Sequence, residues 1–422
     1  MKTVETSLTQ ENTSLRWRDQ VAQKVLFKLL SQLQHGYLSI QDQEQLYTFG
    51  QQGQGLQAHI SVHNRAIYSK VLLGGGSLAA GETYVQGWWD SPDVTKVIRL
   101  LLRNRAVLDR LDHGFSFFSQ WGHRIAHTFK PNSKQGAKKN IVAHYDLGNE
   151  FYKLFLDPTM MYSSAIFPKA EMSLYEAQVY KLDSICQRLA LKPNEHLLEI
   201  GTGWGGMAVY AAEHYGVKVT TTTISEAQYA YVQQLIAQKG LQDRITLLKQ
   251  DYRELTGQYD KLVSIEMIEA VGHQHLPTFF QQCQRLLKPH GRLLIQAITI
   301  ADQRYDRYRH QADFIQRYIF PGGFLPSIHA MSEQIMRHTS LKITGLHDMG
   351  LDYAHTLKLW SHNLQAQQDQ LAALGLDHAF YRLWQFYLHY CEGGFRERLI
   401  STVHLVADQP EYAYEHPTLC LD

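Results

Sequence analysis

The sequence predicts an α/β protein in which a domain with a mainly parallel sheet follows a smaller α+β domain. Its 422 residues exceed the length of one ordinary domain. Strand-like and helix-like segments alternate from residue 196 onward, which is typical of βαβ units with helices on both faces of a sheet. An apolar run at residues 197–200 ends in the glycine-dense turn GTGWGG. Together these observations predict a ligand site at the carboxyl ends of the strands.

The first 130 residues predict the smaller domain. Residues 1–14 are polar, and the apolar spacing of residues 15–33 suits a helix. Short alternating runs at residues 56–62 and 67–73 are interpreted as strands. Residues 93–111 then carry a second helical pattern.

A polar and basic stretch at residues 131–140 is interpreted as a linker, with a domain boundary near residue 135. The catalytic domain then covers residues 141–422. Within it, strands are expected at residues 196–200, 217–223, 245–249, 261–264 and 292–298, and helices at residues 205–214 and 226–239.

Composition excludes several classes of protein. Lys and Arg total 41 against 40 Asp and Glu, so overall charge does not drive nucleic-acid binding. The four cysteines form no C-x-x-C pair, and the histidines form no metal-binding pair, so no metal is expected. No apolar run reaches the ~18 residues of a membrane span. We expect a soluble cytoplasmic protein that can still lie on a membrane surface.

The glycine turn suits two ligands. Gly201, Gly203 and Gly206 fit the G-x-G-x-x-G pattern of a dinucleotide site, in which a pyrophosphate lies at the helix N-terminus. Glu199, just before the turn, favours instead the cationic amino acid end of S-adenosylmethionine. An unliganded structural turn is the third interpretation.

The following strand lacks the acidic residue that usually binds a ribose. Residues 217–223 read VKVTTTT, so the nearest candidates for the ribose are Thr223 and Gln228. Asp251 and Tyr252, just after residues 245–249, are placed to meet an adenine, and Tyr252 offers a stacking face.

Longer motifs identify a family. The catalytic domain resembles that of cyclopropane fatty acid synthases, which add a methylene bridge across lipid double bonds. The resemblance spans the rest of the chain and is weaker in the N-terminal domain. It is carried by residues 144–152 (HYDLGNEFY), 198–205 (LEIGTGWG), 268–272 (IEAVG), 318–323 (YIFPGG), 391–396 (CEGGFR) and, before them, 81–90 (GETYVQGWWD).

The resemblance implies a Rossmann-like class I methyltransferase domain that uses S-adenosylmethionine. The block at residue 144 leads into a helix carrying Asn149, Phe151 and Tyr152, a cap over the cofactor in which Phe151 and Tyr152 either contact the ligand or pack. Residues expected to bind the cofactor are Tyr145, Tyr162, Ser163, Glu199, Gly201, Gly203, Thr223, Ile224, Gln228, Asp251, Tyr252, Ser264 and Ile265.

The implied reaction leaves a carbocation on the acyl chain, so it needs a dry aromatic pocket and an anionic base. The resemblance implies a bicarbonate ion as that base, held by Ser164, Glu269, Gln296, Ile298 and Tyr353. Ser164 stands where the family usually has Cys, and Gln296 where it commonly has His. We hypothesise that the Gln296 amide replaces the histidine contact.

Three of these residues have simpler interpretations. Glu269 could be a carboxylate at a helix start, and Tyr353 a half-buried tyrosine on a strand. Cys391 is a further candidate active-site residue by resemblance, but a free cysteine on an apolar helix is more often part of the core.

A membrane partner follows from the implied substrate, an acyl chain of an unsaturated phospholipid. Residues 96–130 mix basic, aromatic and aliphatic side chains, which suits either the inner membrane surface or packing on the catalytic domain. The predicted function is cyclopropane formation on such chains. Methyl- or methylene-branched products, or a lipid-binding protein with a decayed site, are the alternatives, and a homodimer stays open.

Overall fold

The computed structural model describes residues 17–105, 148–310 and 313–413. The chain divides into two compact units, residues 1–121 and 122–422. The division falls between residues 105 and 148, outside the described ranges, so the linker at residues 131–140 stays a prediction. Among the described residues, no helix is long and apolar enough to cross a membrane.

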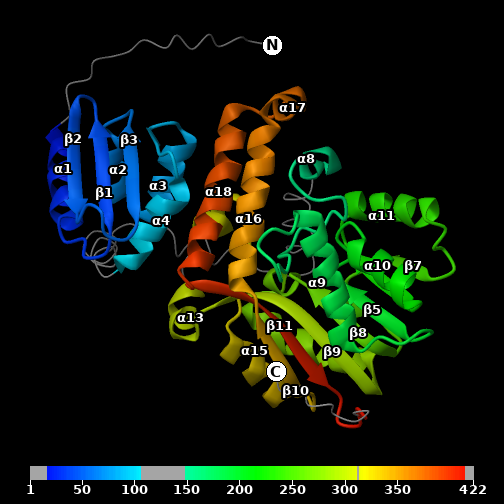
Figure 1. The fold of residues 1–422 in the computed structure, drawn as a ribbon. Helices are drawn as coiled ribbons and strands as arrows, with labels where there is room; N and C mark the ends of the chain where they lie inside the picture. Colours follow the sequence, from blue (N-terminus) through cyan, green and yellow to red (C-terminus); the bar gives the residue numbers. More distant parts are fainter. Residues whose placement is uncertain (1–16, 106–147, 311–312, 414–422) are drawn as a thin grey trace. The chain divides into compact units, whose positions relative to one another are not determined.

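The first unit is a small α+β fold with a four-stranded sheet in the order β2-β1-β3-β4 (Figure 1). Buried Asp42 joins its layers by accepting hydrogen bonds from Gln23, Arg65 and Tyr68 at 2.9–3.1 Å. Its elements are α1 (Trp17–Leu30), β1 (Tyr37–Asp42), β2 (Gln45–Gly50), β3 (Gln57–Val62), α2 (Ile67–Leu73), α3 (Ser77–Val85), β4 (Trp89–Asp90) and α4 (Val94–Arg103).

One expectation for this unit was wrong, because residues 67–73 form helix α2 rather than a strand. The run IYSKVLL is apolar enough for either structure. In the fold, Ile67, Tyr68 and Leu72 are buried, which is the spacing of one helical face. The helix predicted over residues 93–111 begins at Val94 as α4 and is described to Arg103.

The second unit contains a seven-stranded sheet in the order β10-β11-β9-β8-β5-β6-β7. Strands β5 to β9 pair in parallel, whereas β11 and β10 extend the sheet in antiparallel pairing. The strands are β5 (His196–Ile200), β6 (Lys218–Thr223), β7 (Ile245–Lys249), β8 (Tyr259–Ile265), β9 (Leu287–Ile300), β10 (Lys342–Asp348) and β11 (Ile400–Asp408). The predicted parallel sheet is confirmed, with strand bounds within a few residues, except that β9 begins five residues earlier.

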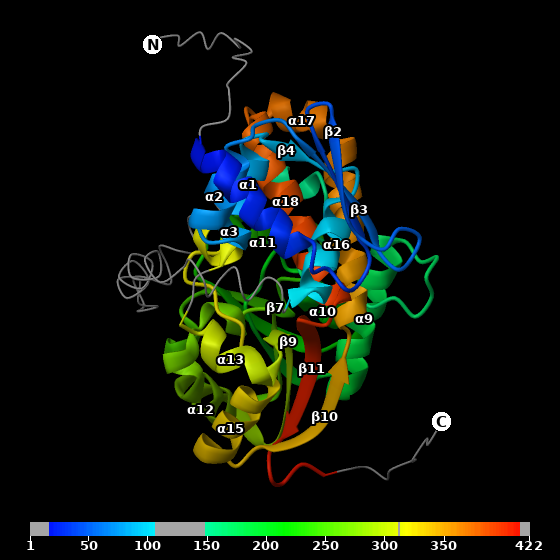
Figure 2. The ribbon, with the colours of Figure 1, turned by 90° about the vertical axis from the view of Figure 1, so that its left-hand side faces the viewer.

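Helices cover both faces of this sheet (Figures 1 and 2). Residues of α9, α10 and α11 share one buried apolar cluster with the strands, and residues of α12 and α15 share the other. The helices are α8 (Asn149–Lys153), α9 (Leu174–Leu189), α10 (Gly206–Tyr215), α11 (Glu226–Gln238), α12 (Leu276–Leu286), α13 (Asp302–Tyr308), α14 (Phe314–Tyr318), α15 (Ile328–His338), α16 (Gly350–Ala366), α17 (Gln368–Ala373) and α18 (His378–Arg396), with short 3₁₀ turns η1 (Tyr252–Glu254), η2 (Ile268–Ala270) and η3 (His273–His275).

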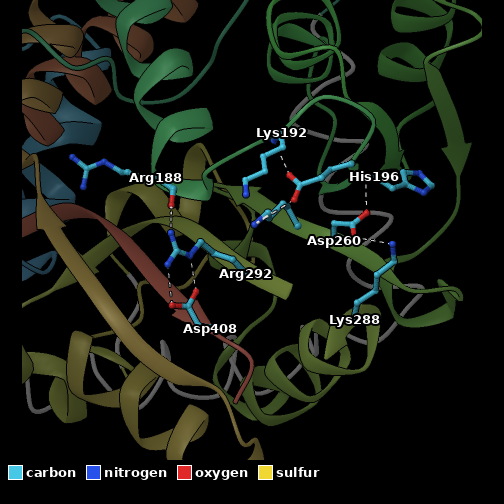
Figure 3. A network of polar contacts seen from close by, with 9 residues as sticks. Arg188, Lys192, His196, Asp260, Lys288, Arg292 and Asp408 are labelled. Atoms are coloured by element: carbon cyan, nitrogen blue, oxygen red, sulfur yellow. Dashed lines mark hydrogen bonds and ion pairs between the residues drawn. The ribbon is translucent and has the colours of Figure 1, made fainter. Parts of the chain in front are cut away.

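The amino-terminal edge of the parallel strands is closed by polar contacts (Figure 3). Arg292 on β9 pairs with buried Asp408 at 2.7 Å and donates to the Arg188 carbonyl at the end of α9. Asp260 on β8 accepts from the His196 backbone at 2.9 Å and from Lys288 at 2.7 Å. These charged side chains are therefore paired within the protein. The ligand site is expected at the opposite edge of the sheet, where the parallel strands have their carboxyl ends.

Candidate active site at the carboxyl edge of the sheet

The glycine turn joins β5 to α10 in left-handed backbone. Gly201, Gly203 and Gly205 have φ of 97°, 52° and 87°. L residues rarely adopt such values, so glycine is required for this path. A Cβ at Gly201 would lie 3.2 Å from the Met267 side chain, which places the turn against the end of β8.

Glu199 is buried at the end of β5. Its carboxylate accepts a hydrogen bond from Thr221 at 2.6 Å. Burial raises the pKa of Glu199 to about 8, although the Thr221 bond and the charge of Lys181 act in the opposite direction. A cationic ligand would favour the ionised carboxylate, as the predicted contact with the amino acid end of S-adenosylmethionine requires.

The predicted ribose group is assembled at the end of β6. The Thr223 hydroxyl donates to the Gln228 amide oxygen at 2.8 Å, and both side chains are buried. Ser225 caps α11 and receives a backbone contact from Gln228, which holds the amide near the strand end. Ile224 lies between these residues and is half-buried.

The residues expected near the adenine contact other residues of the protein. Asp251 follows β7 and accepts two hydrogen bonds from the Arg253 guanidinium, at 2.6 and 2.8 Å. Tyr252 packs edge-on against Phe279 with centroids 5.6 Å apart. The Ser264 hydroxyl donates to the Ile200 carbonyl at 3.1 Å, so it ties β8 to β5, and Ile265 ends β8 half-buried.

Lys181 is a site residue that sequence reasoning missed. It lies on the buried face of α9, and its ammonium donates to the Ser163 hydroxyl at 2.8 Å. Its charge interacts with Glu266, Asp157 and Glu199, while burial lowers its pKa to about 8. A lysine within an otherwise apolar helical stripe was the signal in the sequence.

Aromatic side chains pack together beside the glycine turn and form what we call the aromatic wall. Tyr162 lies 5.3 Å from Trp360 and 5.4 Å from Tyr152, and its hydroxyl contacts that of Tyr387 at 3.0 Å. Phe151 and Tyr152 are fully buried, and the ring of Trp204 in the glycine turn lies tilted against that of Tyr152, with centroids 4.6 Å apart. In the structure these two residues of α8 pack in the core. Tyr145 lies outside the described residues.

The predicted bicarbonate ligands converge, but on a protein side chain. Oε1 of Glu266 accepts from the Ser164 backbone N–H at 3.0 Å and from the Gln296 amide at 2.8 Å. Oε2 of Glu266 accepts from the Tyr353 hydroxyl at 2.9 Å. Three of the five expected ligands are thus engaged by a carboxylate that the sequence analysis had not singled out.

The other two predicted ligands contact each other. Oε1 of Glu269 accepts from the Ile298 backbone N–H at 2.5 Å, and its Oε2 is buried without a hydrogen-bond partner among the described residues. Burial, followed by the charge of Glu266, raises the pKa of Glu269 to about 8.

In this structure, bicarbonate therefore does not fit the position that the resemblance implied. The donors that should hold it already bind Glu266, and a free anion would be repelled by the neighbouring carboxylates of Glu266 and Glu269. The contact of Ser164 with Glu266 is made by its backbone N–H. The Ser164 hydroxyl turns away and donates to the Ala165 carbonyl at 2.9 Å.

Two further residues differ from expectation or were missed. Tyr353 lies on helix α16, not on a strand, and is buried. Buried His404 on β11 is the cross-strand partner of Gln296 and contacts its amide oxygen at 2.9 Å. Cys391 lies on α18, where burial raises the pKa of its thiol.

The sheet order, the glycine turn and the carboxylate at the end of β5 define an S-adenosylmethionine-dependent methyltransferase of class I fold. Solved structures support this: coclaurine N-methyltransferase superposes with a TM-score of 0.59 at 18% identity, covering 78% of this chain and 98% of that one. At that identity the likeness shows the fold.

Closer comparisons show the family. The protein-family sequence model described as mycolic acid cyclopropane synthetase matches residues 132–405, so the chain belongs to this family. The tuberculostearic acid methyltransferase UfaA1 of Mycobacterium tuberculosis is 38% identical over 332 residues, 76% of each chain. The cyclopropane-fatty-acyl-phospholipid synthase of Escherichia coli is 36% identical over 353 residues, 83% of this chain and 87% of that one.

A solved member of the family has the same architecture. The mycolic acid cyclopropane synthase CmaA1, complexed with SAH and CTAB, superposes with a TM-score of 0.61 at 35% identity. The match covers 64% of this chain and 98% of that chain. The predicted family and the predicted class of cofactor are confirmed.

Proposed function

We propose that this protein transfers the methyl group of S-adenosylmethionine to the cis double bond of unsaturated acyl chains in phospholipids, and that it forms a cyclopropane ring. The observation that carries the proposal is a half-buried carboxylate, Glu266, held by three donors beside the glycine turn and a cluster of aromatic side chains. Methyl transfer to an amine or hydroxyl needs no such enclosure, whereas an alkene forms a carbocation that water would capture.

The residues divide this chemistry between them. The alkene π electrons form the new bond to the methyl carbon as the carbon–sulfur bond breaks. Faces of Tyr162, Trp360 and Tyr353 supply the electron-rich wall that tolerates the positive charge on the acyl chain. The site must then remove a proton from the former methyl group, and its electron pair closes the ring.

A methylene-branched product is the second candidate. It is favoured by the relative named a tuberculostearic acid methyltransferase, which is 38% identical to this chain. Both products lose a proton from the same methyl group. They differ in whether a hydride first moves along the acyl chain to the carbocation. Proton removal that is faster than this hydride shift gives the ring, and slower removal gives the methylene branch.

The experiment offers the full-length protein S-adenosylmethionine and vesicles of cis-unsaturated phospholipid. We expect a gain of one CH₂ per modified acyl chain by mass spectrometry and cyclopropane proton signals by NMR. Double-bond derivatisation distinguishes the ring from a methylene branch. Failure to consume S-adenosylmethionine with any unsaturated vesicle would overturn the proposal.

The membrane encounter is part of the same proposal. A substrate still within a bilayer requires the protein to dock on the cytoplasmic membrane surface, and residues 96–130 supply basic and aromatic side chains for this. Most of this segment lies outside the described residues. Flotation of the full-length protein with anionic vesicles should succeed at low salt and weaken at high salt, and no flotation would remove the docking role.

A further inference from the structure

Glu266 occupies an unusual backbone position directly after β8. Its φ is 48°, in the left-handed region that side chains other than glycine rarely adopt. Its N–H donates to the Gln296 carbonyl at 2.8 Å, which continues the pairing of β8 with β9. The next residue, Met267, lies against Gly201 of the glycine turn. The fold thus maintains an unfavourable conformation at the point where a side chain can face the cofactor turn.

The hydrogen bonds around Glu266 favour its anionic form, whereas burial acts in the opposite direction and raises the pKa of this carboxyl. The Ser164 backbone N–H can only donate. The Gln296 amide is oriented by His404, whose Nε2–H donates to the amide oxygen, so the amide NH₂ faces Glu266. Two N–H donors on Oε1 leave no room for a proton there, and Tyr353 supplies a third donor to Oε2.

Charged residues nearby also favour the ionised form of Glu266. Lys181, fully buried on α9, interacts electrostatically with Glu266 and with Glu199 at the end of β5. Glu269, three residues on, has one donor in the described part of the chain, against three for Glu266. When two desolvated carboxylates interact in this way, they share one proton, and the number of donors assigns that proton to Glu269.

A carboxylate has about four acceptor positions, and three are filled at Glu266. The remaining one is on Oε2, for which Tyr353 is the single donor among residues 17–105, 148–310 and 313–413. A bicarbonate ion held by the same donors would present the same group, a planar carboxylate-like anion with one basic oxygen.

We infer that the Glu266 carboxylate is the base of the reaction and replaces the bicarbonate ion that the family resemblance had implied. This inference rests on the proposed function. Oε2 takes a proton from the former sulfonium methyl carbon, and the electron pair of that C–H bond closes the ring or forms the methylene. Glu266 becomes a neutral carboxylic acid, and S-adenosylhomocysteine leaves uncharged at sulfur. Gln296 and His404 are positioning residues that hold this carboxylate.

Two variants at one position test the inference. Glu266→Gln keeps the shape and fills the site but cannot accept the proton. Glu266→Gly removes the side chain at a φ that glycine adopts without strain, so it leaves the donors of Ser164, Gln296 and Tyr353 free for an added ion. Each is compared with wild type and with Glu213→Gln, a surface control on α10 that pairs with Lys239. Circular dichroism, melting temperature and S-adenosylmethionine titration check folding and cofactor binding.

Rates are measured in buffer stripped of carbon dioxide and again with added bicarbonate. We expect wild type and Glu213→Gln to be indifferent to bicarbonate. Glu266→Gln should lose about 10²- to 10⁴-fold in rate in either buffer, the usual range for a lost general base. Glu266→Gly should lose a similar factor without bicarbonate and recover activity in a saturable way when it is added.

The outcomes separate the inference from the proposed function. A wild-type protein that modifies no unsaturated vesicle contradicts the proposed function. An active wild type that slows when bicarbonate is removed overturns the role of Glu266. So does a folded Glu266→Gln that keeps its rate, or a folded, cofactor-binding Glu266→Gly that bicarbonate leaves inactive.

Discussion

Glu199 gives the protein a pH dependence that can be predicted with its sign. Its carboxyl pKa is about 8 in the folded protein without ligand, because of burial, against 4.5 as the ordinary value. The folded state therefore keeps a proton between pH 4.5 and 8 that the unfolded chain has lost. Stability from this group is fully present below pH 4.5, falls as pH rises through this window, and levels off above pH 8.

The perturbation is Glu199→Gln, which resembles the protonated side chain but cannot ionise. The difference between the two pKa values corresponds to ~5 kcal/mol as an upper limit. Relaxation and water entry around a charged carboxylate reduce this, so we expect about 2 kcal/mol. For a unit of about 300 residues, that raises the melting temperature of the variant over wild type by roughly 3 °C at pH 9.

The assay is a thermal melt of the ligand-free proteins from pH 5.5 to 9, with Glu213→Gln as the surface control. The gap between Glu199→Gln and wild type should be small at the acidic end and widen towards pH 8. The variant should also bind S-adenosylmethionine about 10- to 100-fold more weakly, since one charge-assisted contact is lost. A gap that does not change with pH, together with unchanged affinity, would refute the assigned role of Glu199.

Three other substitutions test the site. Gln296→His should change the rate modestly and leave the product unchanged, because Glu266 keeps its Ser164 and Tyr353 donors. Product analysis checks this. A switch to branched chains would show that position 296 decides how the proton is lost. Cys391→Ser should retain activity within a few fold in a turnover assay, since the reaction needs no thiolate; a large loss in a folded protein would make the thiol part of the machinery. Trp360→Ala should lower the free energy of unfolding by about 3–5 kcal/mol in urea titrations, whereas a change below ~1 kcal/mol would contradict the tight packing of this fully buried ring.

Local sequence determined most of the catalytic sheet. Strand β5 and strand β7 begin and end where residues 196–200 and 245–249 predicted. Those segments are short apolar runs bounded by polar or glycine-rich turns, so neighbouring residues contain most of the information. The glycine turn was also predictable from local sequence, because the positive φ at Gly201 and Gly203 depends on the residue type at each position.

Local sequence failed where the decisive contact is distant. Residues 67–73 carry an apolar run that suits a strand or a helix, and packing against the rest of the first unit selected the helix. Tyr353 likewise lies on a helix, and its hydroxyl meets a carboxylate 87 positions earlier. The antiparallel strands β10 and β11 were also not predicted, although β11 supplies His404.

By itself, the sequence determined the family, the methyl donor and which residues would gather around the base. Only the tertiary structure decided what those residues hold. Ser164, Gln296 and Tyr353 were expected to bind a free ion, and the fold brings Glu266 into their centre. No spacing in the chain contains that information, because hydrogen bonds to one carboxylate join segments 30, 87 and 102 residues away from it. The physical reason is that burial leaves a charged group stable only where several distant donors meet it at once.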